Sequence, residues 1–421
     1  MRIDDLARRV VITGLGAVSC CGIGKEAFWA SVRDGVSGIS RLDLFDTTGL
    51  SCKIGGQIRG FDPLDHIEAK EARHQGRFVH YAIAAAREAY EDSGLASSKT
   101  DPYDTGVAFG SSGAGYGNLG DDVNRQFVED GLRAVDPYAI VEVPAHATTS
   151  HIAIDLGLKG PNMTSSTGCA TAIITMSQGV AALQSGRAQA MIVGASEASL
   201  GPLVFGLLTR LRVMSTRNDD PTHAFRPYDK NRDGLVLSDG SGAVVLETAA
   251  HAMNRGAHIY AEVRGYGITS EAYHMVIALP TGEELARAIG TALATGRMGP
   301  SEIDYACAHG VASKQYDMAD TLGLKKALGD HAYHIPVSSI KPVMGQPFSA
   351  SAALQTVATC MAMATDTIPP TVNLEAPDEE CDLDFVPGTA RRGRIDAAVL
   401  NAHSFGGTHG AVVLRRFDER F

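Results

Sequence analysis

Four strand-like segments occur twice along the chain in the same order, and this repetition limits the folds that the sequence can adopt. Each segment is short, apolar and rich in β-branched residues, a pattern typical of strands buried on both faces of a sheet. The repetition predicts two related halves that meet at a shared junction. The paired segments are 10–16 with 261–267, 105–111 with 303–309, 163–166 with 336–339, and 190–195 with 397–402.

Helical patterns lie between these segments, for example over residues 78–93 and 282–294. Alternating strands and helices predict layered α/β halves, with function at the junction between them. The length of 421 residues exceeds the ~250–300 residues that usually share one core. We therefore expect an N-terminal half over 1–255 and a C-terminal half over 256–421.

Composition excludes several classes of function. The net charge is −11, and no cluster of basic residues is extensive enough to form a nucleic-acid-binding face. The seven cysteines are scattered without a C-x-x-C pair, so we expect neither a disulfide framework nor a metal site. The most apolar stretch, 190–208, is interrupted by Glu197 and Pro202 and cannot span a bilayer. We expect a cytoplasmic protein without a membrane partner.

Two short motifs match known binding loops only in part. Gly14-Leu-Gly16 follows a strand, but Ser19 stands where a dinucleotide-binding loop needs its third glycine. The segment 229–234 copies the first half of a calcium-binding loop, but Gly240 stands where the bidentate glutamate is required. The sequence therefore predicts a strand entering a loop at the first site and a structural turn at the second.

Cys169 is the first candidate for chemistry. It follows a strand and the tight turn at Gly168, and the helical pattern of 170–183 begins directly after it. At the start of a helix, free N–H groups and the helix dipole favour a thiolate, which is a nucleophile. The alternative is an inert cysteine buried in the core. Placement in the turn does not by itself decide between these two interpretations.

Three further segments point toward the same junction. His309 ends a predicted buried strand, and Lys341 ends the strand that repeats the one before Cys169. A buried lysine needs a carboxylate partner, for which Asp317 and Asp320 are the candidates. A glycine-rich turn over 401–409, with Phe405 at its centre, follows the last predicted strand. His309 can equally be a structural histidine.

The chain resembles the elongating β-ketoacyl-acyl-carrier-protein synthases of fatty-acid and polyketide assembly, which have the thiolase-type fold. The resemblance covers essentially the whole chain. It implies an α/β protein of two pseudo-symmetric halves in five layers, αβαβα. The matching motifs are Arg9-Val-Val-Ile-Thr-Gly-Leu-Gly, Thr167-Gly-Cys-Ala-Thr, Ser215-Thr-Arg-Asn-Asp, Arg226-Pro-Tyr-Asp-Lys, Arg232-Asp-Gly, Ala272-Tyr-His-Met, Pro369-Pro-Thr-Val-Asn-Leu, Cys381-Asp-Leu-Asp-Phe-Val-Pro and Phe405-Gly-Gly-Thr.

The resemblance implies a role for each matching residue. Cys169 would take an acyl group from a carrier-protein thioester, and the N–H groups of Cys169 and Phe405 would bind the oxyanion. Phe405 would also gate the site. His309 would help to decarboxylate a malonyl thioester, and Lys341 would pair with an acidic residue and hold the active-site histidines.

One position departs from the family pattern at the centre of the site. Gln346 stands where the family has its second histidine. Glutamine can donate an N–H to a thioester oxygen, but it carries no charge and cannot exchange a proton at neutral pH. Transfer of an acyl group to Cys169 could survive this change while decarboxylation suffers.

Other departures lie nearby. Asp320 replaces a glutamate, His403 and Ser404 replace an aromatic residue and a glycine, and His409 replaces an asparagine. We expect an altered active site. The two histidines either compensate for the missing one or are packing residues.

The resemblance also implies what the protein binds. The substrates would arrive on the phosphopantetheine arm of an acyl carrier protein, with no other cofactor and no metal. Ser313, Val311 and His274 match positions beside that arm, although Val311 replaces a threonine. The family pairs as homodimers or heterodimers, through the strand after the nucleophile helix. Residues at positions used for carrier docking are Lys70, Arg73 and Arg212, which by sequence alone are ordinary solvated side chains.

Three functions remain open. The first is a condensing enzyme of a specialised fatty-acid or polyketide pathway. The second is a non-elongating partner that resembles a chain-length factor, although such partners typically lack the cysteine that this chain keeps. The third is an acyltransferase that loads Cys169 and passes the acyl group on without decarboxylation.

Overall fold

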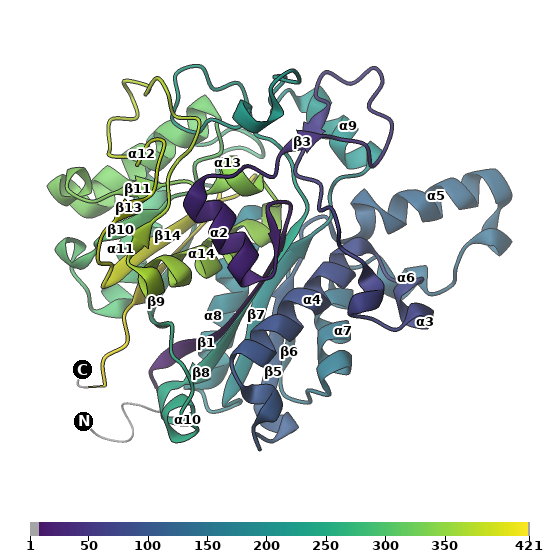
Figure 1. The fold of residues 1–421 in the computed structure, drawn as a ribbon, viewed down its shortest axis with the longest axis horizontal. Coiled ribbons are helices and arrows are strands. Elements are labelled where there is room, and N and C mark those ends of the chain that lie inside the picture. The colour runs from purple at the N-terminus through teal and green to yellow at the C-terminus, as the bar shows by residue number, and fades with distance from the viewer. Residues whose placement is uncertain (1–7, 420–421) are drawn as a thin grey trace.

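A computed structural model describes residues 8–419 and shows one large mixed sheet crossed by helices (Figure 1). The hydrogen-bonded strand order is β11-β10-β14-β15-β9-β1-β8-β7-β5-β6, with the short β2 paired to β1. The strands are β1 (Val10–Ser19), β2 (Gly22–Ile23), β5 (Thr105–Gly110), β6 (Asn162–Ser165), β7 (Ala190–Glu197), β8 (Gly240–Thr248), β9 (Ala261–Ser270), β10 (Tyr305–Cys307), β11 (Val337–Ser338), β14 (Ala397–His403) and β15 (Thr408–Arg415).

The strand order confirms the predicted duplication. From one edge the sheet runs β6-β5-β7-β8-β1, and from the other it runs β11-β10-β14-β15-β9. The four repeated segments thus form strands at equivalent positions in the two series. A fifth pair, β8 and β15, also occupies equivalent positions. The two series meet where Val10–Ile12 of β1 pair with Ala261–Val263 of β9, over only three residue pairs.

Helices form three layers around these strands, as the five-layer expectation requires. Helix α4 (Arg77–Asp92) and helix α7 (His146–Leu156) cover the outer face of the first series, and α11 (Glu283–Gly296) with α12 (Lys314–Leu328) covers the second. Between the two series lie α8 (Thr171–Gln184) and α14 (Ser351–Thr365), which contact strands of both. Thirteen of the fifteen residues of α14 are buried, as a helix enclosed on all sides must be.

The glycines of the partial dinucleotide motif do not form a loop, so the predicted loop after the first strand is wrong at this point. Gly14 and Gly16 lie inside β1, pressed against α4. A Cβ on Gly16 would lie 2.0 Å from the carbonyl oxygen of Ala85. In the repeat, a Cβ on Gly267 would lie 2.0 Å from the carbonyl oxygen of Ala288 in α11. Both strands need glycine because a helix backbone packs directly on them.

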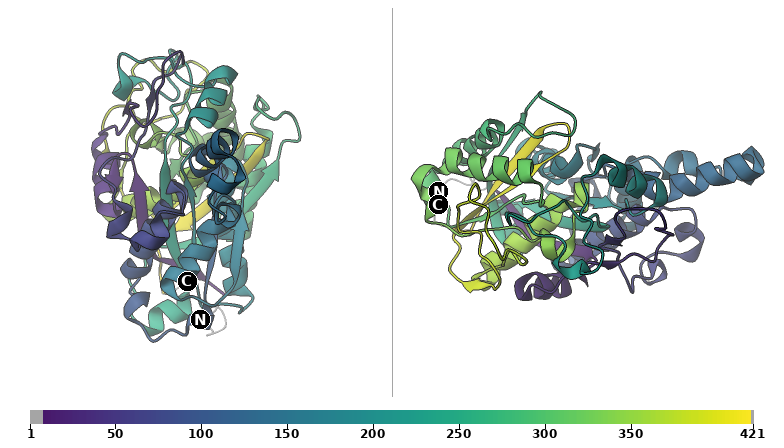
Figure 2. Two further views of the ribbon diagram at one scale, coloured as in Figure 1. Left: turned by 90° about the vertical axis from the view of Figure 1, so that its right-hand side faces the viewer. Right: turned by 90° about the horizontal axis from the view of Figure 1, so that it is seen from above.

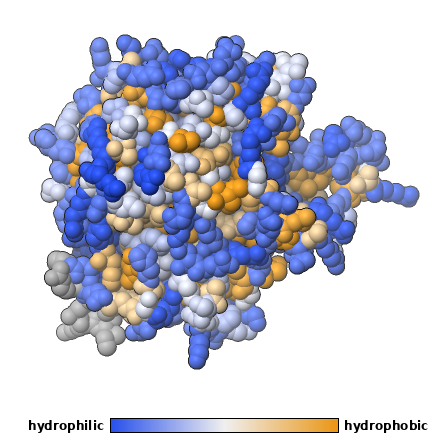
Figure 3. Space-filling model, in the orientation of Figure 1, coloured by the Kyte–Doolittle hydropathy of each residue, from blue (hydrophilic) through white to orange (hydrophobic). Residues whose placement is uncertain are grey.

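The remaining elements surround this framework. A segment containing α5 and α6 extends away from the body (Figures 1 and 2), and hydrophobic side chains are visible on it in Figure 3. Within residues 8–419, no helix is both long and apolar enough to cross a membrane. The elements are α2 (Lys25–Asp34), α3 (Ala69–Ala72), α5 (Leu119–Asp130), α6 (Ala139–Glu142), α9 (Pro202–Leu211), α10 (Ala249–Asn254), α13 (Lys341–Met344), β3 (Ser40–Arg41) paired with β4 (Ile54–Gly55), and β12 (Thr367–Ile368) paired with β13 (Arg391–Arg392).

Two further expectations are corrected. The strand after the nucleophile helix is β7, which cannot pair with another chain because β5 and β8 occupy both of its edges. The strand at that edge of the sheet is β6. The glycine-rich turn over 401–409 does not end the sheet either, since it connects β14 to β15 as an antiparallel hairpin.

The charged segment over 229–234 is a structural turn, as predicted. The two carboxylate oxygens of Asp229 accept hydrogen bonds from the N–H groups of Asn231, Glu375 and Ala376, at 2.7–3.0 Å. Arg232 is paired with Asp317 at 3.3 Å. These contacts tie the segment to the neighbouring loop.

The contact between β1 and α4 makes a testable prediction. We expect Gly16→Ala to lower the free energy of unfolding by about 1–3 kcal/mol, because the new methyl group must displace a helix backbone. Gly290→Ala is the matched control, since a Cβ at that helical position meets no atom within 4 Å. It should be neutral or stabilising by up to about 1 kcal/mol. Chemical denaturation measures both, and equal effects would contradict the packing argument.

Candidate active site

Cys169 lies in a single 3-10 turn, Gly168–Ala170, that leads directly into α8. Gly168 has φ of +60°, a conformation that suits glycine and reverses the chain after β6. Ser404 holds the turn from the β14–β15 hairpin. The Ala170 N–H donates to its Oγ at 2.8 Å, and the Ser404 hydroxyl donates to the Thr167 carbonyl at 2.7 Å. Ser404 therefore fixes the turn that contains Cys169 to the loop between β14 and β15, residues 404–407, which we call the Phe405 loop.

Gln346 reaches Cys169 from the other half of the molecule. The connection after β11 passes through α13, and its end places the Gln346 side-chain N–H 3.1 Å from Cys169 Sγ. The Gln346 amide oxygen is buried and has no hydrogen-bond partner among the described residues. The backbone is fixed, since the Gln346 N–H donates to the Val236 carbonyl at 2.8 Å. The amide can thus stabilise a thiolate or a thioester by donating, but it cannot supply a proton.

Lys341 and His309 lie behind this pair. Lys341 is fully buried, and its ammonium group donates to the backbone carbonyl of His309. The expected carboxylate partner is wrong, because no carboxylate oxygen within residues 8–419 comes within the 4 Å of an ion pair with Lys341. The lysine therefore fixes the His309 backbone by a charge-assisted hydrogen bond.

Asp320, one of the two expected partners, binds neutral donors instead. It accepts hydrogen bonds from the Tyr228 hydroxyl at 2.6 Å, the Gly310 N–H at 3.1 Å and the Asn401 amide at 2.7 Å. Through Gly310 and Asn401, the Asp320 carboxylate connects the segment after β10, which carries His309, to the hairpin that carries Phe405.

Burial controls the ionisation of the site. It raises the pKa of Cys169 to about 12, although the Lys341 charge opposes that rise. Burial lowers the pKa of Lys341 to about 8 and, with the nearby Lys341 charge, lowers the pKa of His309 well below its usual range. The sequence left open whether Cys169 is a thiolate or a thiol. Desolvation, the largest cause of the raised pKa of Cys169, favours a neutral thiol beside a neutral imidazole.

A cavity of about 400 Å³ opens over these groups and brings together most of the predicted residues. Cys169 reaches it from the 3-10 turn before α8 and His309 from the segment after β10, and the exposed Arg212 also lines it. The predicted residues that line it are Cys169, His309, Gln346, Phe405, Val311, Ser313 and Arg212. Lys341 lies behind the wall.

Besides Lys341, three predicted residues do not line the cavity. His274 is exposed, and its Nδ1 accepts hydrogen bonds from the N–H groups of Val276 and Ile277 at 3.0 Å, so it stabilises its own loop. Lys70 and Arg73 are exposed at α3.

Phe405 is half-buried at the cavity wall. Its ring lies 5.9 Å from that of Tyr316, edge to face, and 6.3 Å from that of Phe348. The next residue, Gly406, donates its N–H to the Met275 carbonyl at 2.8 Å. The Phe405 ring thus packs against two other segments.

His403 and His409 do not approach Cys169 as substitutes for the missing histidine. Both contact Glu271, a residue that the sequence reading missed. A second missed carboxylate is Glu197, which is buried and accepts hydrogen bonds from the Ser349 and Ser199 hydroxyls at 2.7 and 2.8 Å. The sequence could have identified Glu197, because it is a charged residue inside the apolar run 190–208. No comparable pattern marked Glu271.

The neutral thiol makes a prediction about reactivity. We expect alkylation of Cys169 by iodoacetamide to rise with pH from 7 to 10 without a plateau, because only the thiolate reacts and its pKa lies above this range. Lys341→Met should slow alkylation at pH 8 by removing the charge that favours the thiolate. Mass spectrometry of the Cys169 peptide measures the rate, with Cys169→Ser as the blank. A plateau near pH 7 would show a resting thiolate instead.

Two family models match successive parts of this chain. Residues 7–252 match the family model "Beta-ketoacyl synthase, N-terminal domain" and residues 260–375 match "Beta-ketoacyl synthase, C-terminal domain". A 3-oxoacyl-[acyl-carrier-protein] synthase 2 of Synechocystis sp. is 38% identical over 97% of this chain and 98% of its own length. The tetracenomycin polyketide synthase ketoacyl synthase alpha subunit of Streptomyces glaucescens is 37% identical over 97% of each chain.

Solved structures agree. A type II polyketide-synthase acyl carrier protein in complex with its ketosynthase gives a TM-score of 0.91 at 31% identity, over 98% of this chain and 100% of that one. The ishigamide ketosynthase/chain length factor gives 0.91 at 28% identity over the same shares. The thiolase-type fold inferred from the sequence is thereby confirmed. The chain belongs to the beta-ketoacyl synthase family.

Proposed function

We propose that this protein transfers an acyl group from a carrier protein to Cys169 and then extends it by decarboxylative condensation with a malonyl thioester. The observation that carries the proposal is the convergence of Cys169, Gln346 and His309 on one cavity, from both halves of the fold. The synthase relatives have the same overall fold and length.

In the first step, Cys169 sulfur attacks the thioester carbonyl, and the carrier's pantetheine sulfur leaves as the new carbonyl–sulfur bond forms. Neutral His309 is the available base for the thiol proton, which the leaving sulfur finally takes up. The Cys169 N–H, at the start of a helical turn, and the Phe405 N–H would bind the oxyanion. The Phe405 N–H has no hydrogen-bond acceptor among the described residues, which supports this role.

In the second step, the malonyl thioester loses CO2, and its α-carbon attacks the acyl group on Cys169. The carbon–sulfur bond breaks and the thiolate is released. His309 and Gln346 would donate hydrogen bonds to the thioester oxygen that gains charge. Without a second imidazole, this step depends on one amide and one neutral histidine.

The substrates would be bound through the phosphopantetheine arm of an acyl carrier protein. Ser313 keeps a hydroxyl at the cavity wall, whereas Val311 offers only a methyl surface. His274 is exposed and does not line the cavity, so its position does not support a role in binding this arm. We also infer that the two halves 1–255 and 256–421 act as one catalytic unit, and that the protein works in the cytoplasm.

A dimer is part of the proposal. The exposed edge strand β6 and the projecting segment with α5 are the surfaces available for a second ketosynthase-type chain. This segment carries exposed apolar side chains, which a partner would cover. They include Phe127, Val128, Leu132, Tyr138 and Ile140.

One observation favours a second candidate function. The Gln346 side chain cannot exchange a proton, so an acyltransferase that passes the Cys169 acyl group on without decarboxylation fits the same cavity. A chain-length-factor-like role fits less well, because the thiol lies in the cavity with a hydrogen-bond donor 3.1 Å away.

Intact-mass measurements distinguish these functions. We expect an acyl carrier substrate to leave an adduct on the wild type and none on Cys169→Ala. With malonyl carrier added, a β-ketoacyl product and CO2 should appear. An adduct without CO2 would favour the acyltransferase, and no adduct would reject both.

Gln346 can be tested on its own. Gln346→Ala should slow condensation by about 10²–10³-fold through loss of one hydrogen-bond donor. Gln346→His should raise CO2 release if the missing imidazole limits that step. If Gln346→Ala condenses at the wild-type rate, the amide takes no part in the reaction.

Docking depends on charge. Carrier proteins are acidic, so Lys70→Glu, Arg73→Glu and Arg212→Glu should each raise the KM for a carrier-bound substrate several-fold at low salt, with little change in kcat. The effect should shrink as ionic strength rises. Arg287→Glu, on the exposed face of α11, is the control and should leave KM unchanged. Equal effects at all four positions would argue against a local docking site.

A further inference from the structure

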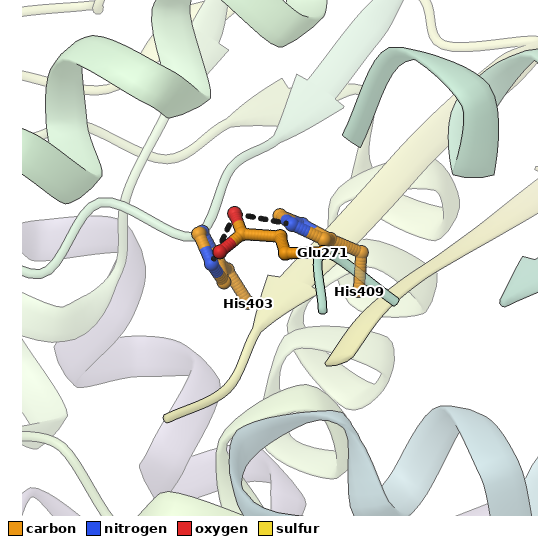
Figure 4. A group of neighbouring side chains, drawn as sticks. All are labelled: Glu271, His403 and His409. Atoms are coloured by element: carbon orange, nitrogen blue, oxygen red, sulfur yellow. Dashed lines mark hydrogen bonds and ion pairs between the residues drawn. The ribbon is translucent and has the colours of Figure 1, made fainter. Parts of the chain in front are cut away.

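Three buried side chains meet beside the cavity without a role in the proposed reaction (Figure 4). Glu271 directly follows β9, His403 ends β14, and His409 lies in the second position of β15. His409 Nε2 lies 2.9 Å and His403 Nε2 lies 3.1 Å from the same oxygen, Oε1 of Glu271. The ligand-type atoms of all three residues lie within 4.8 Å of one another.

The cluster is shielded from solvent and incompletely hydrogen-bonded. The side chains of both histidines are 1% exposed, and that of Glu271 is 3% exposed. Among the described residues, Nδ1 of both histidines lacks a hydrogen-bond partner, and the contact of His403 Nε2 with Glu271 Oε1 at 3.1 Å is an ion-pair contact without good hydrogen-bond geometry. Buried polar atoms without partners are costly, so their convergence needs an explanation. An ion beside Oε1 of Glu271 would be bound by Nε2 of both histidines, because these two nitrogens already face that oxygen.

The geometry fits a small divalent cation. Bonds of 2.0–2.2 Å from Zn²⁺ to histidine nitrogen and carboxylate oxygen place tetrahedral ligand atoms about 3.3 Å apart. The two histidine–carboxylate contacts of 2.9 and 3.1 Å need to widen by only a few tenths of an ångström, and all three ligand atoms lie within 4.8 Å of one another. Two histidines and one carboxylate, with a fourth position open, are a usual donor set for this ion.

We propose that Glu271, His403 and His409 form a binding site for a divalent transition-metal ion, with Zn²⁺ the best match. The other carboxylate oxygen of Glu271 accepts the Leu279 N–H at 3.1 Å, which leaves Oε1 for the metal. The Glu271 N–H donates to the Gly407 carbonyl at 2.8 Å, so the carboxylate is fixed to the hairpin at its backbone as well.

The proposed site lies beside the cavity, so a bound metal would affect the loop that carries Phe405. His403 lines the cavity, and its ring lies 4.5 Å from Tyr316 and 6.2 Å from His309. Phe405 lies between the two histidine ligands along the hairpin. A bound ion would cross-link both ends of the Phe405 loop to the end of β9 and thereby restrict the movement of Phe405. The site differs from the reaction centre, since it contains neither Cys169 nor Gln346.

The scattered cysteines gave no reason to expect a metal in this chain. The proposed site uses none of them. Both histidines stand where the family pattern has an aromatic residue and an asparagine. Replacing His403 by an aromatic residue and His409 by asparagine is therefore compatible with the fold, and these two substitutions make suitable tests.

The experiment measures metal content directly. Purified protein is treated with a chelator, exposed to excess Zn²⁺, passed through a desalting column and analysed for zinc per chain. We expect about one Zn²⁺ per chain in the wild type. His409→Asn and His403→Phe should weaken Zn²⁺ binding by more than about tenfold, since even loss of an indirect partner costs this much. Zn²⁺ should raise the unfolding temperature of the wild type but not of these variants.

Controls separate this site from other ligands. Cys169→Ser should keep its zinc, and so should His223→Asn, which removes a histidine from an exposed histidine–aspartate pair. Co²⁺ in the wild type should give the visible absorption of a tetrahedral site without a thiolate charge-transfer band, whether or not the variants fold. The proposal is overturned if the wild type keeps no zinc, if His409→Asn keeps it, or if Cys169→Ser loses it. None of these readouts depends on condensation activity.

Discussion

The enclosure of α8 and α14 between the two series of strands is the constraint on which the site depends. Thirteen of the fifteen residues of α14 and nine of the fourteen residues of α8 are buried, so neither helix can shift without opening the core, and the turns that precede them have fixed positions. Cys169 lies in the turn before α8, and Gln346 lies shortly before α14. Gln355 inside α14 strengthens the arrangement, because its amide donates to the carbonyls of Cys307, Ala308 and Asn401 at 3.1–3.2 Å. Helix α14 thus holds the ends of β10 and β14. His309 follows β10 in the chain, and the Phe405 loop follows β14.

The same burial determines the chemistry of the resting site. A helix start favours a thiolate, but the loss of solvent around Cys169 has the larger effect and keeps the thiol protonated. Lys341 provides the opposing positive charge from behind the wall, where its ammonium group is bound to the His309 carbonyl. The pKa of Cys169 therefore depends on the charge and polarity of the substrate groups that enter the cavity. A neutral Gln346 makes this balance less favourable for a developing anion than a protonated imidazole would.

The departures from the family pattern form two connected groups in space. Gln346 and Asp320 alter the hydrogen bonds around Cys169 and His309, while Ser404, His403 and His409 alter the hairpin that carries Phe405. Ser404 fixes that hairpin to the nucleophile turn, and the two histidines connect it to Glu271. Both ends of the Phe405 loop are thus held by polar contacts in the core as well as by packing.

The sequence by itself determined the duplicated strand order, the layered α/β class, the position of Cys169 before a helix, and the family. These follow from local periodicity and from short motifs, which neighbouring residues encode. The tertiary structure alone decided that β7 is an inner strand, that Gly14 and Gly16 pack on α4, and that Lys341 binds a carbonyl rather than a carboxylate. It also brought Glu271 to two histidines more than 130 positions away. Desolvation, strand neighbours and such long-range contacts depend on distances between segments remote in the chain, and no local pattern specifies them.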